Sequence, residues 1–359
     1  MLKIGLLGPQ DDQEVMAVKT RLENRGIITV DMDFGQYPGH MSVSFKNSNI
    51  AINGMDISGL GSAFQRGRGV HLPFYVFFDI DKVKYIKTVR DNWESIHARH
   101  IRYVKKEIAC QKLRCAVIQA LSRNCQIINP MIHNDLHRLK TYTMFRLRKN
   151  GLPVPDFIIG TAQHKLKKFI SLSAANGYET VIKPLAGIYK TRLWDENSWQ
   201  RHKWKARGVF YQHFIKGDTI RCYVLDNKVI AAARIVHRGT VDSSQSQTGI
   251  QVLNLPDKAI DIALKTANTL DLTFCGMDLM HETKSGKYYV IDCNISPMFV
   301  NFARLSRIDI PGLIADYLIT AAEKTKNKKI KKFKLLTDIK EIITIDNDIK
   351  NFIKSKSEN

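Results

Sequence analysis

The pattern of apolar and polar residues at the start of the chain predicts a strand, a helix and a second strand. Residues 3–8, KIGLLG, form an apolar run typical of a buried strand. In the segment that follows, Val15, Val18 and Leu22 recur at helical spacing and therefore share one face. Residues 27–34, IITVDMDF, predict another strand. The chain thus opens with a βαβ-like unit, and because GxGxxG is absent, we assign no dinucleotide site to it.

The remaining chain alternates between helical and strand patterns. Residues 92–124 are largely helical in pattern and basic, and a helix that begins near residue 136 ends at Gly151. Further along we expect a helix over 163–176, strands over 179–185 and 209–215, a hairpin over 220–234, a helix over 257–270 and a hairpin over 274–294. This mixture indicates an α+β fold with several lobes.

Composition is that of a soluble globular protein. The chain has 359 residues, of which 44% are hydrophobic and 25% charged. No apolar run is long enough to span a bilayer, and the first residues do not form a signal peptide. The six cysteines include no CxxC pair, which favours reduced thiols over disulfides or zinc. We therefore expect a cytoplasmic protein that does not associate with membranes.

The net charge of +21 indicates acidic partners. Nucleotide phosphates, an acidic peptide or a nucleic acid would each complement it, and a lysine-rich composition that serves solubility alone remains an alternative. Two arginines, Arg66 and Arg68, lie in the glycine-bounded stretch FQRGRG and could bind a substrate carboxylate or belong to an ordinary surface.

The hairpin over 274–294 predicts a divalent metal site. If Thr283 pairs with Lys287 around a three-residue loop, Asp278 lies directly opposite Asp292. Asn294 is two residues further along the strand and points to the same side. Two facing acids are costly unless a cation lies between them, and carboxylate and amide oxygens suit Mg²⁺ or Mn²⁺ better than zinc. The alternative, an acid and an amide that only close the strand, is weaker once the pairing is considered.

The hairpin over 220–234 predicts a cluster of basic side chains. With Asp226 and Asn227 as its two-residue turn, Arg221 would lie opposite Ala232, and Thr219 opposite Arg234. Arg221, Tyr223 and Arg234 would then share one face. Such a pair of arginines forms either an anion clamp or a solvated surface, and the residues alone do not decide between them.

The order of these motifs resembles the ATP-grasp carboxylate–amine ligases. The resemblance rests on Lys140, GLPVP, VIKP with Lys183, YQHFIKGDTIRCYV and GMDL followed by YYVIDCNISP. The most similar branches are ribosomal-protein glutamate ligases, bacterial glutathione synthetases and peptide-modifying ATP-grasp ligases. The resemblance implies two α+β lobes that hold ATP between them. The central lobe, with linking helices, would span 101–208, and the carboxy-terminal lobe, with the metal site, would span 209–322. An amino-terminal α/β substrate-side domain would precede them over 1–100, and a basic tail would follow over 323–359.

The resemblance also implies roles for individual residues. Lys140 and Lys183 would contact ATP phosphates, and the hinge of Gln212, His213, Phe214 and Ile215 would hold the adenine through its backbone. Asp278, Asp292 and Asn294 would hold Mg²⁺ or Mn²⁺. Arg221 would neutralise the transferring phosphate or the acyl-phosphate intermediate, and Arg234, expected on the same face of its hairpin, is the second predicted catalytic residue. The loop PLAGIYKTRLW contains a single glycine where the family has several, and its Lys190 could reach a phosphate.

These roles predict an ATP- and Mg-dependent ligase that forms an amide bond through an acyl phosphate. Its partners would be a carboxylate substrate and an amine substrate, each an amino acid, a peptide or a protein, and the resembled family commonly forms homo-oligomers. One alternative is a weakened ATP-grasp scaffold that binds nucleic acid, which the charge and the glycine-poor loop motivate. Another is transfer of phosphate to a carboxylate or alcohol without ligation.

Overall fold

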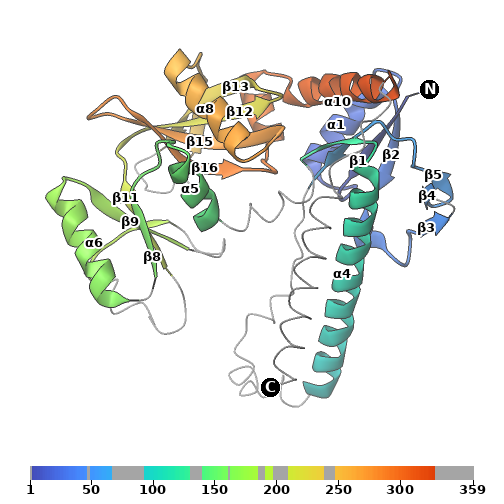
Figure 1. Ribbon diagram of the computed structural model, residues 1–359, viewed down its shortest axis with the longest axis horizontal. Helices are drawn as coiled ribbons and strands as arrows, with labels where there is room; N and C mark the ends of the chain where they lie inside the picture. Colours follow the sequence, from blue (N-terminus) through green and yellow to red (C-terminus); the bar gives the residue numbers. More distant parts are fainter. Residues whose placement is uncertain are drawn as a thin grey trace, which may run out of the picture.

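The computed structural model describes residues 2–46, 49–66, 93–129, 140–160, 162–184, 191–196, 209–237 and 247–327. Their strands form four sheets, and Figure 1 shows how these sheets and their helices are arranged. No described helix is both long and apolar enough to cross a membrane. Of the predicted tail over 323–359, residues 323–327 belong to a helix that ends at Asn327, and the rest lies outside the described residues.

The amino-terminal sheet is parallel, with the order β2-β1-β6-β7. Its strands and helices are β1 (Lys3–Leu7), α1 (Gln13–Glu23), β2 (Ile28–Met32), β6 (Ser62–Gln65), α4 (Trp93–Leu121) and β7 (Gln126–Ile128). The predicted βαβ opening is confirmed, because β1 and β2, which precede and follow α1 in the chain, pair in parallel. The last strand of this sheet, β7, ends at Ile128. The domain boundaries inferred from the sequence stay a prediction.

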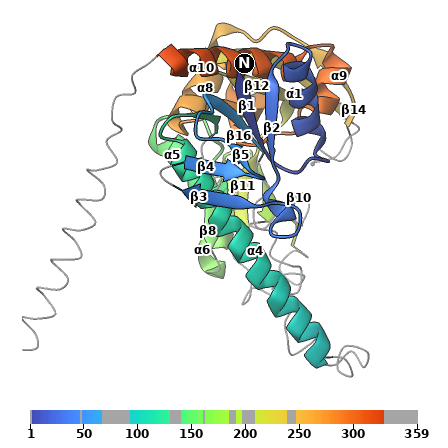
Figure 2. The ribbon, with the colours of Figure 1, turned by 90° about the vertical axis from the view of Figure 1, so that its right-hand side faces the viewer.

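Helices cover both faces of this sheet. Val15, Val18 and Leu22 of α1 pack against one face, as their spacing predicts. The end of α4 packs Val117 and Ile118 against the other face. Figures 1 and 2 show that the beginning of α4 extends well beyond the sheet as a single helix. A short 3-10 helix, η1 (Phe34–Gln36), and a small antiparallel sheet of β3 (Val43–Lys46), β4 (Asn49–Ile52) and β5 (Met55–Asp56) complete this part.

The central sheet has the order β10-β9-β11-β8. Its elements are α5 (Lys140–Lys149), β8 (Phe157–Gly160), α6 (Gln163–Ala175), β9 (Glu179–Pro184), β10 (Arg192–Leu193) and β11 (Val209–Phe214). Leu166 and Ile170 of α6 pack against Ile182 and Tyr211 on one face. The opposite face carries Phe210, which belongs to the core of the carboxy-terminal sheet.

The carboxy-terminal sheet is antiparallel, with the order β14-β13-β12-β15-β16. Its elements are β12 (Gly217–Leu225), β13 (Lys228–His237), β14 (Gln247–Val252), α8 (Asp257–Thr269), β15 (Phe274–Glu282), β16 (Tyr288–Asn294), α9 (Val300–Ser306) and α10 (Ile310–Asn327). One face packs against α5 and α8 around Cys222, Met277 and Val290.

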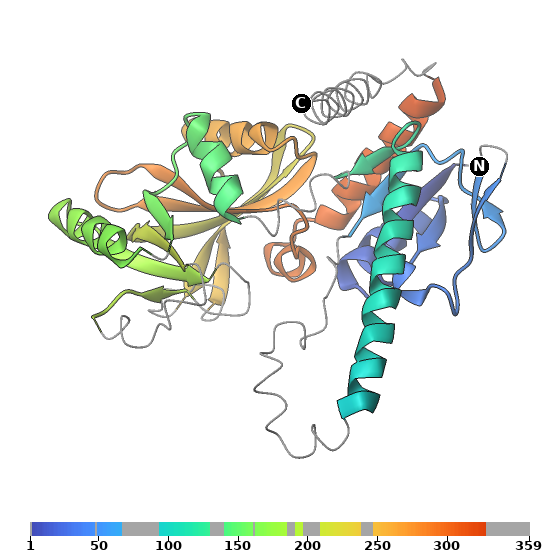
Figure 3. The same cartoon turned by 60° about the horizontal axis from the view of Figure 1, so that its bottom comes forward.

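The other face of this sheet shares a core with the amino-terminal sheet. Tyr223 and Phe274 of the carboxy-terminal sheet lie in one apolar cluster with Ile4, Phe64 and Leu318. The helix α10 contacts strands of both sheets, and Figure 3 shows it running between them. A continuous apolar core therefore joins the two sheets.

The registers of the two hairpins differ from the simple predicted ones because each contains a β-bulge. In the hairpin of β15 and β16, His281 pairs with Tyr288, so the loop is one residue longer than predicted. An irregularity after Asp278 then restores the predicted pairing of Asp278 with Asp292. The prediction that Thr283 pairs with Lys287 is wrong, yet the pairing of the two acids is confirmed.

The bulge in the other hairpin changes the predicted outcome. Asp226 and Asn227 form the predicted turn, with φ of 47° and 60°. A register shift between Tyr223 and Val224 then places Arg221 opposite Ala233, and Ile220 opposite Arg234. The predicted register is therefore wrong beyond the shift, and Arg234 lies on the face opposite to that of Arg221.

Candidate functional site

A row of charged side chains crosses three strands of the carboxy-terminal sheet. Arg221 of β12 pairs with Asp278 of β15, and Asp278 pairs with Asp292 of β16. Since directly paired residues share a face, all three side chains project from the same side of the sheet. A basic residue and two acids thus lie side by side. The two acids are neighbours, as the predicted metal site requires.

Arg221 and Asp278 form a forked ion pair. Arg221 Nη2 donates to Asp278 Oδ2 at 3.0 Å, and Nε donates to the other carboxylate oxygen. Two parallel N–H to oxygen bonds fix the orientation of both groups. The carboxylate of Asp278 raises the pKa of the Arg221 guanidinium, partly offset by burial. The next residue on this face, Tyr223, donates its hydroxyl to Met298 O at 2.7 Å, and burial raises its pKa to about 12.

Lys140 contacts the second acid of the row. Its Nζ lies 3.0 Å from Asp292 Oδ2, while Asp292 Oδ1 accepts the backbone N–H of Cys293 at 3.1 Å. Lys140 is the first residue of α5, and this helix packs against β16. The lysine expected near phosphate and the acid expected near metal are therefore direct neighbours.

Asn294 ends β16 and starts a tight turn. Its Oδ1 accepts the N–H of Ser296 at 3.0 Å, which is an Asx turn. Pro297 then packs over Gly276, the residue directly opposite Asn294. A Cβ added at Gly276 would lie 2.7 Å from Pro297 Cβ, so only glycine allows this close approach. The sequence SP after Asn294 thus folds the chain back across its own strand pair.

The donors in this row suit a hard cation. Asp278, Asp292 and Asn294 offer only oxygen atoms, the ligands that Mg²⁺ prefers, and Mg²⁺ commonly takes its remaining ligands from water and phosphates. Within the described residues, no group of three or more His, Cys, Asp or Glu side chains could hold a metal. Two acids and one amide fall outside that pattern, and they fit a site completed by phosphate oxygens.

The central sheet contributes Lys183 and Gln212 from one face. Lys183 of β9 pairs with Phe210 of β11, and Gln212 is two residues further along β11, so both side chains point away from α6. Gln212 is 1% exposed, and within the described part of the chain its Nε2 has no hydrogen-bond partner. A buried amide donor without a partner is costly unless a ligand accepts from it.

His213 projects from the opposite face of the same strand. Its ring stacks on Tyr178 at 4.8 Å and on Phe169 at 5.3 Å between centroids. Burial lowers the pKa of the His213 imidazole below its ordinary value, with Asp156 acting in the opposite direction. Its side chain packs against α6, so any contact with an adenine would have to come from the backbone, as predicted for Phe214 and Ile215 as well. These residues connect β11 to β12 and thus join two sheets.

The structure separates Arg234 from Arg221. Arg234 lies on the opposite face and contacts Asp218, with 3.4 Å between Nη1 and Oδ2, because of the register shift described above. Its predicted position beside Arg221 is therefore wrong. Lys190 falls outside the described residues.

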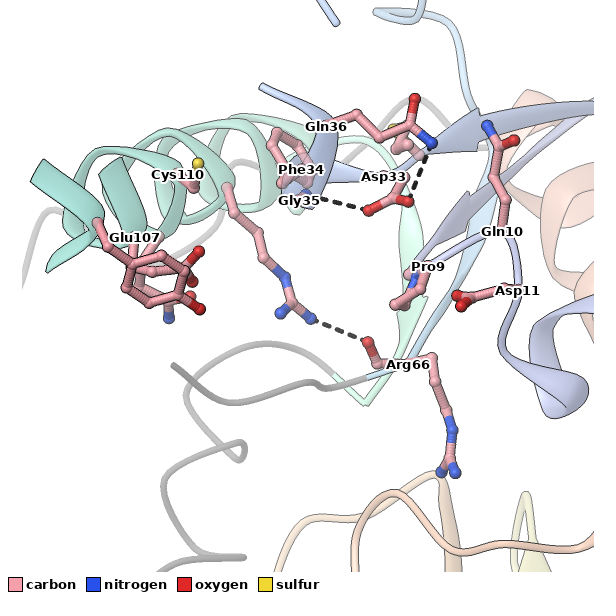
Figure 4. A pocket seen from close by; sticks show the side chains of 15 residues that line it. Pro9, Gln10, Asp11, Asp33, Phe34, Gly35, Gln36, Arg66, Glu107 and Cys110 are labelled. Atoms are coloured by element: carbon pink, nitrogen blue, oxygen red, sulfur yellow. Dashed lines mark hydrogen bonds between the residues drawn. The ribbon is translucent and has the colours of Figure 1, made fainter. Parts of the chain in front are cut away.

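Arg66 has a different environment from that suggested by its glycine-bounded loop. A pocket of about 500 Å³ lies where β1, β2 and β6 end, and its lining includes Asp33, Arg66 and Arg114. Figure 4 shows that the Arg66 side chain points away from Asp33 and Gln10, toward the carboxy-terminal part of the chain. It contacts Asp12, Ser296 and Pro297. Arg68 lies outside the described residues.

The family follows from comparison with known proteins. A family model described as a RimK-like ATP-grasp domain matches residues 138–318, slightly more than half of the chain. The chain belongs to the RimK-like ATP-grasp family. The matched range contains every residue predicted to bind ATP or metal and both predicted catalytic arginines, and the resemblance to ATP-grasp ligases is confirmed.

Two curated relatives illustrate the range of this similarity. N-acetylaspartylglutamate synthase A of Homo sapiens is 27% identical over 212 residues, which are 55% of this RimK-like chain and 53% of that protein. Tetrahydromethanopterin:alpha-L-glutamate ligase of Methanocaldococcus jannaschii is 24% identical over 262 residues, or 67% of this chain and 85% of that protein. The chain therefore spans about half the length of the first relative and most of the second.

Solved structures extend the similarity beyond the matched domain. The ATP-grasp ligase PsnB, complexed with a phosphomimetic variant of its minimal precursor, Mg and ADP, has a TM-score of 0.74 at 26% identity, covering 89% of this chain and 98% of that one. The RiPP-associated ATP-grasp ligase of Chryseobacterium gregarium, in complex with ADP and a leader and core peptide, has a TM-score of 0.69 at 14% identity and covers 89% of this chain and 97% of that one. The second likeness concerns the fold alone. The predicted α+β ATP-grasp fold of this RimK-like protein is confirmed.

Proposed function

We propose that this RimK-like protein is an ATP- and Mg-dependent ligase that joins a carboxylate to an amine through an acyl phosphate. The observation that carries the proposal is the row of Arg221, Asp278 and Asp292, with Lys140 bonded to its last member. Such a row combines oxygen donors for a divalent cation with fixed positive charge for phosphate. Family membership supports the same chemistry.

Each group of residues has a role in this proposal. Asp278, Asp292 and Asn294 would hold the magnesium ion, which when bound would neutralise charge on the ATP phosphates. Lys140 and Lys183 would bind the phosphates, and the buried amide of Gln212 would donate to the nucleotide. Arg221 would stabilise the charge that develops on the phosphoryl group as the substrate carboxylate attacks the γ-phosphorus and ADP leaves.

The second half of the reaction needs orientation rather than a protein nucleophile. An amine attacks the acyl carbon, the carbon–oxygen bond to phosphate breaks, and the amine loses a proton as inorganic phosphate departs. Holding the two substrates in one orientation supplies much of the rate increase for such a step. The proposal therefore assigns no covalent role to the buried Cys293, which shares a core with Met277.

We further propose that the substrates are amino acids or peptides. Two curated relatives are named as glutamate ligases, and the solved ligase PsnB binds a precursor peptide. The net charge of +21 favours acidic substrates of either kind. Mn²⁺ would bind to the same oxygen donors as Mg²⁺.

The test is turnover by the full chain with ATP, Mg²⁺ and candidate acids and amines. Ligation yields ADP, phosphate and a product lighter by one water than its two substrates together. We expect Asp292→Ala to abolish ADP formation while circular dichroism stays that of the unaltered protein. Asp261→Ala, at an exposed helix position, is the matched control and should retain turnover.

Two outcomes would reject the proposal. A product that keeps the phosphate would indicate phosphoryl transfer without ligation. A protein that never forms ADP but binds RNA, with an affinity that falls steeply with salt, would instead be a nucleic-acid-binding scaffold.

A further inference from the structure

The turn after Asn294 is held by a buried arginine from the amino-terminal sheet. Arg66 follows β6, is 9% exposed, and donates from Nη1 to Ser296 Oγ and to Pro297 O, both at 2.9 Å. The same nitrogen also donates to Ser296 O. One guanidinium nitrogen is thus bonded to three oxygens in two consecutive residues of the turn.

The other nitrogens of Arg66 fix it to its own domain. Nε lies 3.3 Å from Asp12 Oδ1, and Nη2 lies 3.2 Å from Glu14 Oε2, which is 4% exposed. Asp12 is the residue that caps α1 by accepting from Glu14 N and Val15 N. A guanidinium that bonds two carboxylates on one side and carbonyls on the other has its orientation fixed by its planar fork.

A second side chain anchors the preceding residue of the turn. Asn129, just after β7, donates from Nδ2 to Ile295 O at 2.7 Å. Its Oδ1 accepts the N–H groups of Thr273 and Phe274, each at 3.0 Å. The carbonyl oxygens of three consecutive residues, 295 to 297, therefore accept hydrogen bonds from side chains of the amino-terminal sheet.

The turn over residues 295–297 also fixes the side chain of Asn294. The amide oxygen of Asn294 accepts the N–H of Ser296, so the position of Ser296 sets the position of that oxygen. Pro297 packs on Gly276, directly opposite Asn294. A displacement of residues 296–297 would therefore reach the Asn294 side chain through one hydrogen bond and one close packing contact.

We infer that Arg66 is a positioning residue for the divalent metal, acting through the Ser296–Pro297 turn on the amide of Asn294. The inference rests on the proposed function, because it needs Asn294 to be a metal ligand. It gives the amino-terminal domain a direct part in assembling the metal site. Replacing a group that orients a metal ligand typically costs about 10- to 100-fold in metal affinity or activity.

The experiment measures Mn²⁺ binding by electron paramagnetic resonance, with ADP present, in the full chain. Arg66→Lys keeps a positive charge beside Asp12 and Glu14 but loses the fork that reaches the turn. We expect Mn²⁺ to bind at least about 10-fold more weakly. In turnover, the Mg²⁺ concentration for half-maximal rate should rise while kcat at saturating Mg²⁺ changes little.

The matched control is Arg21→Lys. Arg21 also joins the amino-terminal part to the carboxy-terminal part, through an exposed pair with Asp309 at 2.9 Å, and it lies outside the turn. This variant should bind Mn²⁺ as the unaltered protein does. Ser296→Ala removes one Arg66 contact without disturbing a buried charge, and should weaken Mn²⁺ binding in the same direction by a smaller factor.

The outcomes separate this inference from the proposed function. If the unaltered protein binds Mn²⁺ with ADP, and folded Arg66→Lys binds it equally well, only the role of Arg66 is overturned. If Arg66→Lys does not fold, Ser296→Ala decides, and unchanged binding in that variant rejects the inference. If the unaltered protein neither binds Mn²⁺ nor forms ADP, both the proposed function and this inference fail.

Discussion

Lys140 and Asp292 are separated by 152 residues in the chain, and a hydrogen bond of 3.0 Å joins Lys140 Nζ to Asp292 Oδ2. Both belong to the RimK-like domain, where one is expected to bind phosphate and the other metal. We therefore expect this contact to be exchanged when Mg-ATP binds, with the lysine moving to a phosphate oxygen and the carboxylate to the metal.

Lys140→Ala should weaken ATP binding. Loss of a charged hydrogen bond to phosphate costs about 1.5–3 kcal/mol, which is roughly a 10- to 100-fold rise in the Kd for ATP. Isothermal titration calorimetry with a nonhydrolysable ATP analogue and Mg²⁺ measures it directly. Lys149→Ala, at the exposed end of the same helix, should leave the affinity unchanged. Equal affinities for the two variants would remove Lys140 from the phosphate site.

The ion pair of Arg221 and Asp278 should contribute measurably to stability. The two side chains are 33% and 24% exposed, so solvent screens them only in part. A double-mutant cycle with Arg221→Met and Asp278→Asn should give a coupling free energy of about 1–3 kcal/mol in urea unfolding. A coupling near zero would contradict the forked contact. The single variant Arg221→Met should also lower turnover at saturating substrates.

Gly276→Ala should distort the turn that follows Asn294. The added Cβ would lie 2.7 Å from Pro297 Cβ, and relieving such a clash typically costs about 1–3 kcal/mol of unfolding free energy. Gly249→Ala is a matched control in another strand of the same sheet, because a Cβ there has nothing within 4 Å. Thermal unfolding of both variants, with Mn²⁺ binding, tests this. A Gly276→Ala protein as stable as the control would mean that the turn can relax.

The free energy of unfolding should depend on pH through His213. Burial lowers the pKa of His213 in the folded state, so below about pH 6.5 the unfolded chain binds more protons than the folded one. Stability therefore falls as the pH decreases from 6.5 toward the lowered pKa. His213→Phe keeps a ring between Tyr178 and Phe169 and should flatten this part of the urea-unfolding profile. Exposed His164→Phe should retain the slope, and a profile unchanged by His213→Phe would refute the assignment.

The sequence alone was sufficient for the elements that depend on periodicity. The βαβ opening and the existence of the two hairpins follow from alternation and turn residues. Asp278 pairs with Asp292 as predicted only because a bulge offsets a loop that is one residue longer than expected. The bulges do not follow, because an extra residue in a strand leaves no mark on the alternation until the partner strand is known. One bulge preserved the predicted pair, whereas the other moved Arg234 to the far face.

Long-range contacts were beyond the reach of sequence patterns. Arg66 in FQRGRG has the appearance of a surface loop residue, and nothing near it indicates that its partners lie 230 positions further along. Asn129 is an equally ordinary residue in sequence, yet it bonds Thr273, Phe274 and Ile295. Both depend on how two sheets pack against each other, which periodicity within one element does not encode.

The apolar cluster shared by the amino-terminal and carboxy-terminal sheets has a practical consequence for how this protein can be divided. A fragment cut at residues 138–318 would retain the whole family match but lose Ile4, Leu6 and Phe64, and with them the cover over Tyr223 and Phe274. Such a fragment would expose a large hydrophobic surface and would tend to aggregate. The matched domain is therefore smaller than the unit that should be expressed for study.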